Sequence, residues 1–555
     1  MSGIKEVLKF LKNTEPREYQ EKIFETCKDK NCLVVLPTGM GKTLVALMLA
    51  IERLMRFPDS KVLFLAPTRP LAEQHLDYFK KNLPELFATL ELFTGKVSAE
   101  KRKKLWQNAE IIFSTPQCVE NDIENNIYDL KEVSLLVIDE CHRCLKNYAY
   151  NYVTAEYIKQ AKNPRVLGLT ASPGVEKSKI KEIGKNLGIE AIEIRTRESE
   201  DVSPYIQKLK FDIVKIDFPT EFSEIRALLR ELYEKKIEEL KNRKLLFAPA
   251  SKKNILELQR RIMAMISTGN RNFNVLAGAS ACAQTIKLQY LLELLETQTL
   301  SSLQRYFLDI FEQAKQGKSK AVQQLIKQPK FNQAYIRTTE LIAQKIENPK
   351  LQKLKEIVEK EMQGKIKRII VFAQYRETLV KICKTLNELQ GVNARVFVGQ
   401  AKKGTGEDAT GLSQKEQREM ISDFTLGKIN VLCASSIGEE GLDIPEVSAV
   451  IFYEPIPSAI RQIQRRGRTA RLKPGKLIVL MIKKTLDEAY YWSAFNKEKK
   501  MYKSLDSLKE ELDEEFNNNQ AKQEENSKSK TEENKNAQEI KDKENKEKSE
   551  QKTLF

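Results

Sequence analysis

The segment "CLVVLPTGMGKTLVALMLAI", residues 32–51, decides the fold class of this chain. It runs from a short apolar stretch, CLVVLP, through a turn that contains Gly39 and Gly41, into an apolar helical pattern. Glycines in such a turn let backbone N–H groups point inward around phosphate oxygens. A strand, a glycine turn and a helix in this order predict a phosphate-binding loop at the edge of a parallel sheet.

The loop contains the residues that a magnesium nucleotide needs. Lys42 can reach the β- and γ-phosphates, and the hydroxyl of Thr43 can bind Mg²⁺ at the helix N-terminus. Leu36 stands where the strict phosphate-loop pattern has its first glycine. We therefore expect ATP and Mg²⁺ to bind along one continuous segment: Pro37, Thr38, Gly39, Met40, Gly41, Lys42 and Thr43.

A second strand end supplies the acidic groups of the predicted site. In LLVIDE, residues 135–140, four apolar residues precede Asp139 and Glu140. Asp139 would hold Mg²⁺, and Glu140 would orient and deprotonate the attacking water. Together with Lys42, these two carboxylates predict hydrolysis of the nucleotide.

The residues that follow allow another interpretation, a zinc site. Cys141, His142 and Cys144 lie close together, but a structural zinc needs about four nitrogen or sulfur ligands. The sequence has no second cysteine pair near enough to complete such a set. We expect instead that His142 relays the nucleotide state to the TAS segment, residues 170–172, at the end of the next strand.

The composition limits the class of protein. A chain of 555 residues is too long for one hydrophobic core, and its net charge of +17 favours a polyanionic partner such as nucleic acid. Eight scattered cysteines are typical of reduced, intracellular thiols. The longest apolar run, residues 44–51, is too short to span a bilayer, and no secretory signal is visible. We expect a cytoplasmic protein with no membrane association.

Strand and helix patterns divide the chain. Short apolar runs alternate with amphipathic helices from residue 32 to 173 and again from about 351, which predicts two parallel-sheet domains. Between about 220 and 345, apolar residues recur at helical spacing in a segment rich in lysine and arginine. This insert is either a bundle with solvated basic faces or an arm that grips a duplex. After about residue 506 the charged, apolar-poor sequence predicts disorder.

An arginine-rich segment in the second predicted domain suits catalysis better than packing. Five arginines lie between residues 461 and 471, in SAIRQIQRRGRTAR. Such guanidinium groups could contact a γ-phosphate held by the other domain, and an arginine finger contributes about 10³–10⁵ in rate. Two domains that share one nucleotide site would make hydrolysis depend on their closure.

The motifs PTGMGKT, DECH, TAS and QRRGRTAR, in this order, resemble the superfamily 2 helicases with two RecA-like domains. The resemblance implies several site residues. Arg468 and Arg471 would be the arginine fingers, supported by Gln464 and Arg465. Asp443 would contact the ribose or the finger network, and Gln20 would recognise adenine. The nucleic-acid backbone would be contacted by Arg69, Gly95, Thr115 and Pro116.

The second domain narrows the resemblance. VFAQYRET and GLSQKEQREMISDF are similar to the archaeal Hef and Fanconi anaemia M (FANCM) DNA helicases, which also have a helical, thumb-like insertion. This resemblance implies action on branched DNA, at forks and junctions, in repair and replication restart. The nuclease signature of Hef is not found here, so no cleavage activity is expected. Two alternatives stay open: a duplex-RNA-dependent ATPase like Dicer and the RNA sensors, and a passive scaffold that binds branched nucleic acid.

The predicted fold is therefore α/β: two RecA-like parallel-sheet domains with an all-α insertion between them and a disordered C-terminal tail. The predicted divisions are residues 1–205, 206–345, 346–500 and 501–555, in that order. The final QKTLF weakly resembles a sliding-clamp peptide through Gln551, Leu554 and Phe555. We expect an archaeal, nucleoid-associated location.

Overall fold

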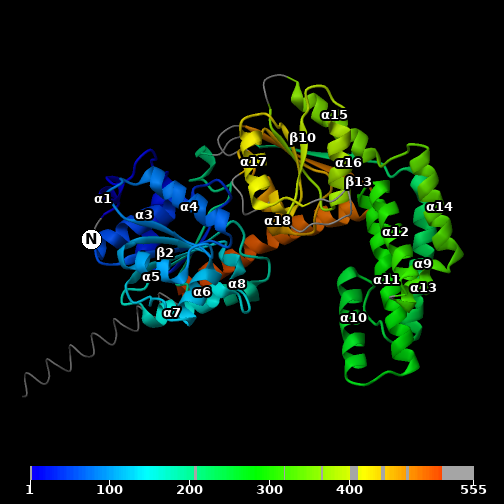
Figure 1. Ribbon diagram of the computed structural model, residues 1–555, viewed down its shortest axis with the longest axis horizontal. Helices are drawn as coiled ribbons and strands as arrows, with labels where there is room; N and C mark the ends of the chain where they lie inside the picture. Colours follow the sequence, from blue (N-terminus) through cyan, green and yellow to red (C-terminus); the bar gives the residue numbers. More distant parts are fainter. Residues whose placement is uncertain are drawn as a thin grey trace, which may run out of the picture. The chain divides into compact units, whose positions relative to one another are not determined.

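The computed structural model describes residues 3–205, 209–317, 319–363, 367–399, 411–438, 444–469 and 474–514. The chain divides into two compact units. The first contains residues 1–37 and 41–201 together with the chain from residue 499 onward, and the second contains residues 38–40 and 202–498. Each unit has one sheet, and the helical bundle lies between the two sheet regions in sequence, so the predicted α/β class is confirmed (Figure 1).

The first unit is built on a seven-stranded sheet in the order β3-β4-β2-β5-β6-β1-β7, parallel throughout. Every residue of β1, β2, β4, β5 and β6 is buried, as expected for strands covered on both faces. The strands are β1 (Cys32–Val35), β2 (Lys61–Leu65), β3 (Leu90–Phe93), β4 (Ile111–Ser114), β5 (Val133–Asp139), β6 (Val166–Thr170) and β7 (Ala191–Ile194).

Helices cover this sheet on both faces, because parallel strands need long crossover connections. Helices α2, α3 and α4 contact one another in turn, and so do α6, α7 and α8. The helices of the unit are α1 (Ile4–Leu8), α2 (Glu18–Asp29), α3 (Lys42–Arg56), α4 (Arg69–Asn82), α5 (Ala99–Asn108), α6 (Pro116–Glu124), α7 (Ala149–Gln160) and α8 (Lys177–Leu187). In the described part of the chain, no helix combines the length and apolar character needed to cross a bilayer.

The second unit has a six-stranded parallel sheet in the order β10-β11-β9-β12-β13-β8. The strands are β8 (Leu209–Ile216), β9 (Ile369–Phe372), β10 (Ala394–Phe397), β11 (Val431–Ala434), β12 (Ala449–Phe452) and β13 (Gly475–Ile482). The helices around the sheet are α15 (Pro349–Met362), α16 (Arg376–Leu386), α17 (Gln414–Thr425) and α18 (Ala459–Arg466).

Strand β8 corrects the predicted start of the insertion. Residues 209–216 were assigned to the helical region, but they form an outer strand that pairs with β13. No residue of β8 is fully buried, and lysine and aspartate interrupt its apolar residues. An edge strand of this kind lacks the continuous apolar run by which the inner strands were recognised.

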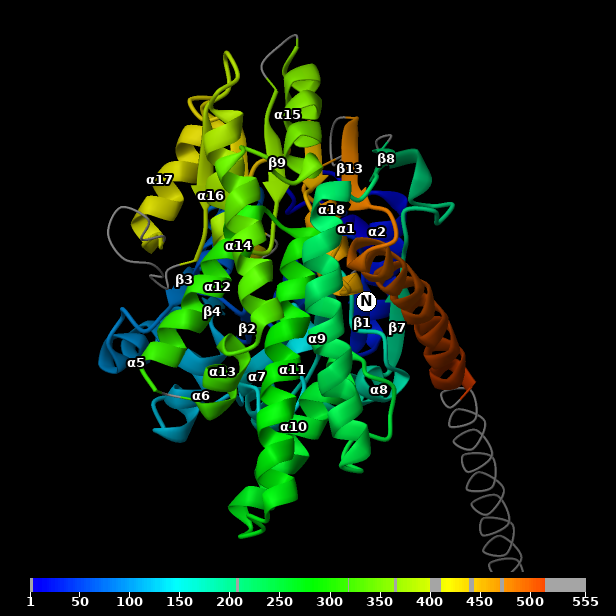
Figure 2. The same cartoon turned by 90° about the vertical axis from the view of Figure 1, so that its right-hand side faces the viewer.

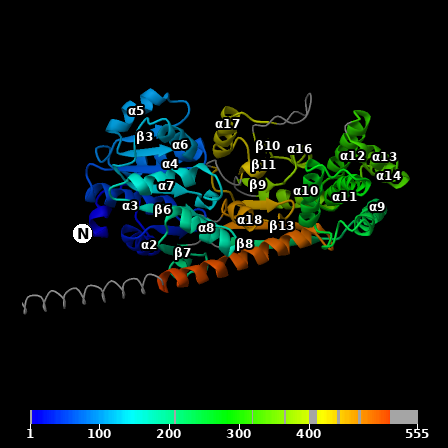
Figure 3. The ribbon, with the colours of Figure 1, turned by 90° about the horizontal axis from the view of Figure 1, so that it is seen from below.

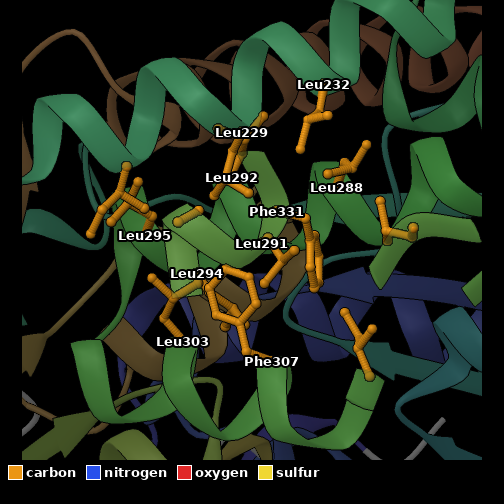
Figure 4. Packing of buried hydrophobic residues seen from close by; sticks show 14 of the residues in the cluster. Leu229, Leu232, Leu288, Leu291, Leu292, Leu294, Leu295, Leu303, Phe307 and Phe331 are labelled. Carbon is orange, nitrogen blue, oxygen red and sulfur yellow. The ribbon is translucent and has the colours of Figure 1, made fainter. Parts of the chain in front are cut away.

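The helical insert is a bundle with its own core. Leucines of α9 and α11 pack with Phe307 of α12 and Phe331 of α14 (Figure 4). Figure 2 shows α9 alongside α11 and α14, which it contacts. The helices are α9 (Ser223–Asn242), α10 (Lys252–Ser267), α11 (Phe273–Thr297), α12 (Leu300–Lys315), α13 (Lys320–Ile326) and α14 (Pro329–Ala343). The helical spacing of apolar residues therefore correctly predicted a bundle.

A buried polar network fastens the insert to the second sheet. Lys350 Nζ lies 2.7 Å from Asp487 Oδ2 and donates to the carbonyl of Thr297, 2.8 Å away, at the end of α11. Thr378 of α16 donates to Gln298 Oε1 at 2.8 Å. Both members of the Lys350–Asp487 pair are fully buried. These buried contacts join the end of α11 to α15, to α16 and to the segment that follows β13, so the insert and the second sheet pack together.

The last described helix, residues 486–514, also corrects the sequence analysis (Figure 3). Residues 501–514 were predicted to begin the disordered tail, but they are helical. Met501, Leu505 and Leu508 recur at helical spacing and are buried. In the first unit, Lys177 Nζ of α8 pairs with Glu511 at 2.5 Å. The rest of the predicted tail, residues 515–555, lies outside the described residues.

Glu454 is a buried carboxyl group near the carboxyl end of β12. It is 2% exposed, and one of its oxygens accepts a hydrogen bond from the backbone N–H of Gln374. Burial raises the pKa of Glu454 to about 7, although the charges of Lys350 and Arg465 act in the opposite direction. At mildly acidic pH the folded protein therefore holds a proton here that the unfolded chain releases.

We expect stability to fall as pH rises from about 4.5 to about 7, because the folded state binds the Glu454 proton more tightly than the unfolded state. The bound proton contributes about 3 kcal/mol to the free energy of unfolding. This stabilisation is complete below the ordinary glutamate pKa and is lost as pH passes the raised pKa of Glu454. Glu454→Gln should remove this part of the pH dependence in thermal unfolding. The control Glu419→Gln, at an exposed position, should keep the wild-type profile. Parallel profiles for wild type and Glu454→Gln would contradict the assignment.

Candidate nucleotide and nucleic-acid sites

The strand order of the first sheet brings the predicted nucleotide residues together. Strands β5, β6 and β1 are neighbours and run parallel, so their carboxyl ends lie at one edge. Asp139 ends β5, Thr170 ends β6, and the phosphate loop follows β1. Ligands of open α/β sheets bind at this edge.

The phosphate loop has the backbone conformation that its glycines permit. Gly39 and Gly41 have φ values of +84° and +78°, in the left-handed region that favours glycine. Gly41 immediately precedes α3, and Lys42 Nζ donates to the carbonyl of Leu36 at 3.0 Å. A Cβ atom on Gly41 would collide with the side-chain amide of Gln20. Gln20 thus lies directly against the loop, and its role in adenine binding stays a prediction.

The structure adds a residue that the sequence analysis missed, His75 on α4. Its Nδ1 lies 3.4 Å from Thr43 Oγ1, and its Nε2 lies 2.9 Å from Asp139 Oδ2. His75 therefore links the two residues predicted to bind Mg²⁺. A signal for it existed, because the chain has only two histidines, and the other, His142, also lies at this edge.

Asp139 has the charge that a cation site needs. Its side chain is buried, and burial acts to raise its pKa, but His75 and the charge of Lys42 outweigh burial and lower the pKa below the ordinary value. The carboxylate is therefore ionised at neutral pH. A carboxylate and a hydroxyl are oxygen ligands of the kind that Mg²⁺ prefers, so Asp139 and Thr43 fit the ion.

Glu140 and His142 connect this site to the TAS segment. Glu140 has a φ of 50°, which is strained for a side chain of this kind and is a feature of functional sites. His142 Nδ1 lies 3.2 Å from both Glu140 Oε2 and Thr170 Oγ1. Thr170 Oγ1 in turn accepts a hydrogen bond from the backbone N–H of Ser172 at 3.1 Å. This chain of contacts matches the path predicted for the relay, whose action stays a prediction.

In the second unit, α18 carries the arginine-rich motif. Arg465 is fully buried, with its guanidinium 4.9 Å from the ring centre of Phe372 and 5.5 Å from that of Phe452. Gln464 and Arg468 are also buried. Asp443 and Arg471 lie outside the described residues. The finger roles of Arg468 and Arg471 stay predictions from the family resemblance.

Models of known families match most of the chain. The DEAD/DEAH box helicase model matches residues 17–180, and the helicase conserved C-terminal domain matches residues 349–473. The intervening residues 221–342 match a third family model, which describes the helical bundle of a provisionally named ATP-dependent RNA helicase.

A solved structure decides the family. The crystal structure of the Pyrococcus furiosus Hef helicase domain is 44% identical, with a TM-score of 0.67, and the match covers 86% of this chain and 98% of that domain. The chain belongs to the Hef and FANCM helicase family. Among curated relatives, the ATP-dependent DNA helicase fml1 of Schizosaccharomyces pombe is 33% identical over 84% of this chain and 57% of its own length.

An archaeal relative of this helicase family is provisionally named an ATP-dependent RNA helicase. It is MJ1505 of Methanocaldococcus jannaschii, 38% identical over 90% of this chain and 61% of its own length. The chain thus spans about three fifths of these two curated relatives.

The predicted nucleic-acid contacts of this helicase lie on the other half of the same sheet edge. Strands β2, β4 and β3 are neighbours, and Arg69, Gly95 and Thr115 follow their carboxyl ends. Gly95 is exposed, and Arg69 pairs with Glu73 at 2.6 Å. Thr115 caps α6, with Pro116 as the first residue of that helix. The arrangement suits contact with a phosphate backbone, and the contacts themselves stay predictions.

A buried ion pair supports the loop that contains Gly95. Arg102 donates from two guanidinium nitrogens to the two carboxyl oxygens of Asp122 and also to the carbonyls of Thr94 and Val97, on either side of Gly95. The buried side chain of Arg102 therefore holds the exposed loop at residues 94–97 in place. Local spacing gives no sign of this pairing, because Arg102 and Asp122 lie on different helices, α5 and α6.

Cys141 and Cys144, considered above as a zinc pair, are core residues. Both side chains are buried, and burial raises the pKa of each thiol. Cys141 packs against Gly168 of β6, where a Cβ atom would lie 3.2 Å from its sulfur. Within the described ranges, no three histidine, cysteine or acidic side chains gather as a metal cluster.

Proposed function

We propose that this protein is an ATP-dependent DNA helicase or translocase that acts on branched DNA in repair and replication restart. The observation that carries the proposal is the shared edge of the first sheet, with Lys42, Asp139 and Glu140 on one half and Arg69 and Thr115 on the other. The relatives named ATP-dependent DNA helicase, fml1 and mph1, support DNA as the substrate. A nucleoid-associated location follows from such a substrate.

In this proposal each side chain at the nucleotide site has one task. Lys42 binds the β- and γ-phosphates, and Glu140 orients and deprotonates water. Thr43 and Asp139 would hold Mg²⁺, and the bound ion would supply positive charge beside the phosphates. The remaining roles follow the family resemblance: Gln20 binds adenine, Gln464 and Asp443 support the nucleotide, and Arg468 and Arg471 stabilise the transferred phosphoryl group.

The helical insert is proposed to bind the DNA branch. Its segment of residues 241–276 contains eight basic residues and one acidic residue. Phe247 and Phe273 are 80% and 81% exposed in the same segment. A basic surface attracts phosphates, and exposed aromatic rings can stack on unpaired bases. We also propose that the four predicted divisions, with the boundary corrections given above, are the functional parts of the chain.

A duplex-RNA-dependent ATPase is the second candidate. The printed names of MJ1505, of the Arabidopsis thaliana relative called RNA helicase FANCM and of the helical-bundle family favour it. Contacts to phosphates do not distinguish the sugars, so the choice rests on relatives. Hydrolysis measured with forked DNA, four-way DNA, linear DNA and duplex RNA at one salt concentration separates the two. A passive scaffold conflicts with the complete set of Lys42, Asp139 and Glu140.

Lys42→Ala and Glu140→Gln should each reduce ATP hydrolysis by at least about 100-fold, because each removes a group that acts on the reacting phosphate or water. Arg471→Ala should weaken hydrolysis more than ATP binding, since a finger acts in the transition state. Steady-state ATPase assays with and without DNA measure the first effect, and nucleotide titration measures binding. Lys9→Ala, at an exposed lysine directly after α1, serves as the control and should be active. Normal turnover in the Lys42 variant refutes the assignment.

Replacing Arg260 and Arg261 of α10 by alanine should reduce the preference for forked over linear duplex. Both residues are exposed in the basic segment, and each lost phosphate contact lowers the slope of log affinity against log salt by about 0.9. Gel-shift titration over a salt series gives both quantities. The matched control replaces Lys320 and Lys327, which are exposed on or beside α13 and carry the same charge. Equal fork preference in the two double variants rejects the proposed role of the segment.

A sliding clamp is a further proposed partner, through Gln551, Leu554 and Phe555. These residues lie outside the described residues, and the proposal rests on the QKTLF sequence. A peptide of residues 541–555 should release or absorb heat on binding the clamp in calorimetry. Replacing Leu554 and Phe555 by alanine should abolish that heat, since the apolar groups would fill the peptide pocket. Absence of heat with the natural peptide ends the proposal.

A further inference from the structure

His75 is held in one orientation by three elements of the first unit. It lies on α4, is 7% exposed, and its ring centre is 4.4 Å from that of Phe64 on β2. One ring nitrogen faces Thr43, at the start of α3, and the other faces Asp139, at the end of β5. None of the roles assigned above to the nucleotide site uses this buried side chain.

The hydrogen-bonding chemistry fixes the direction of the contact with Asp139. An ionised carboxylate only accepts hydrogen bonds, so His75 Nε2–H donates to Asp139 Oδ2 at 2.9 Å. The other ring nitrogen, Nδ1, lies 3.4 Å from the Thr43 hydroxyl, a group that can both donate and accept. A hydroxyl oxygen has two lone pairs, so Thr43 can contact His75 and still offer a lone pair to a cation. Asp139 likewise keeps its second carboxyl oxygen.

We propose that His75 is a positioning residue that holds the Thr43 hydroxyl and the Asp139 carboxylate at the spacing Mg²⁺ requires. This inference rests on the proposed role of Thr43 and Asp139 as magnesium ligands. Groups that orient metal ligands strengthen metal binding, and their loss typically costs about 10- to 100-fold in metal affinity. The proposed contribution of His75 is geometric, because its two ring nitrogens face the two proposed ligands.

The test measures metal binding directly, apart from catalysis. Mn²⁺ titration, followed by electron paramagnetic resonance in the presence of ADP, gives the metal affinity of the full chain. His75→Leu removes both hydrogen bonds and should weaken Mn²⁺ binding by about 10- to 100-fold. Binding of ADP without metal should be unchanged. The matched control is Asp77→Ala, an exposed position on the same helix, which should bind Mn²⁺ as wild type does.

Two polar variants keep the test decisive if the leucine variant does not fold. Glutamine can place an amide N–H near the position of Nε2 and should retain most of the affinity. Asparagine reaches only the Nδ1 position, so His75→Asn keeps the contact with Thr43, loses the contact with Asp139, and should bind Mn²⁺ weakly. Circular dichroism and thermal unfolding establish which variants are folded. A folded leucine or asparagine variant with wild-type Mn²⁺ affinity overturns the proposal.

Asp139→Asn separates the failure of this inference from the failure of the proposed function. If Asp139→Asn weakens Mn²⁺ binding and the folded His75 variants do not, Asp139 is a metal ligand and His75 has no positioning role. If Asp139→Asn binds Mn²⁺ as tightly as wild type, the proposed metal site is wrong, and the inference about His75 falls with it.

Discussion

The parallel alignment of the first sheet is the constraint on which the site depends. When neighbouring strands run in the same direction, their carboxyl ends must lie at one edge, whatever their order in the sequence. The order β3-β4-β2-β5-β6-β1-β7 places the ends of β1, β5 and β6 together on one half of that edge. The residues expected to contact nucleic acid follow the strands of the other half. Nucleotide and nucleic acid would thus meet one rigid surface.

Helix α4 joins the two halves of this edge. Arg69 begins the helix, at the side predicted to contact nucleic acid, and His75 lies six residues farther along, beside Asp139. At 1.5 Å per residue, these positions are about 9 Å apart along the helix axis. The hydrogen bonds of His75 tie α4 to both α3 and β5, so a single helix is fixed to the two segments that would hold the cation. Its packing against Phe64 completes this arrangement.

The second unit combines catalytic and recognition elements in one packed piece. Lys350, Asp487 and Thr297 form a buried polar link between α15, the start of the helix at residues 486–514 and the end of α11. Separating such groups would leave charges buried without partners, which is costly. The basic segment of the insert is therefore carried on the same unit as the arginine-rich α18. Because of this packing, the helical insert and the second sheet form one compact unit.

The sequence by itself determined the strand–turn–helix at residues 32–51, the acidic end of β5 and the helical insert, because these depend on local spacing and continuous burial. The half-exposed β8 escaped recognition because an edge strand has no such apolar run, and residues 501–514 escaped because their buried residues lie within a charged segment. Tertiary structure alone decided that His75 bridges Thr43 and Asp139, and that Arg102 pairs with Asp122. Those partners are 32, 64 and 20 residues away, and only the crossing of the chain through the sheet brings them within hydrogen-bonding distance.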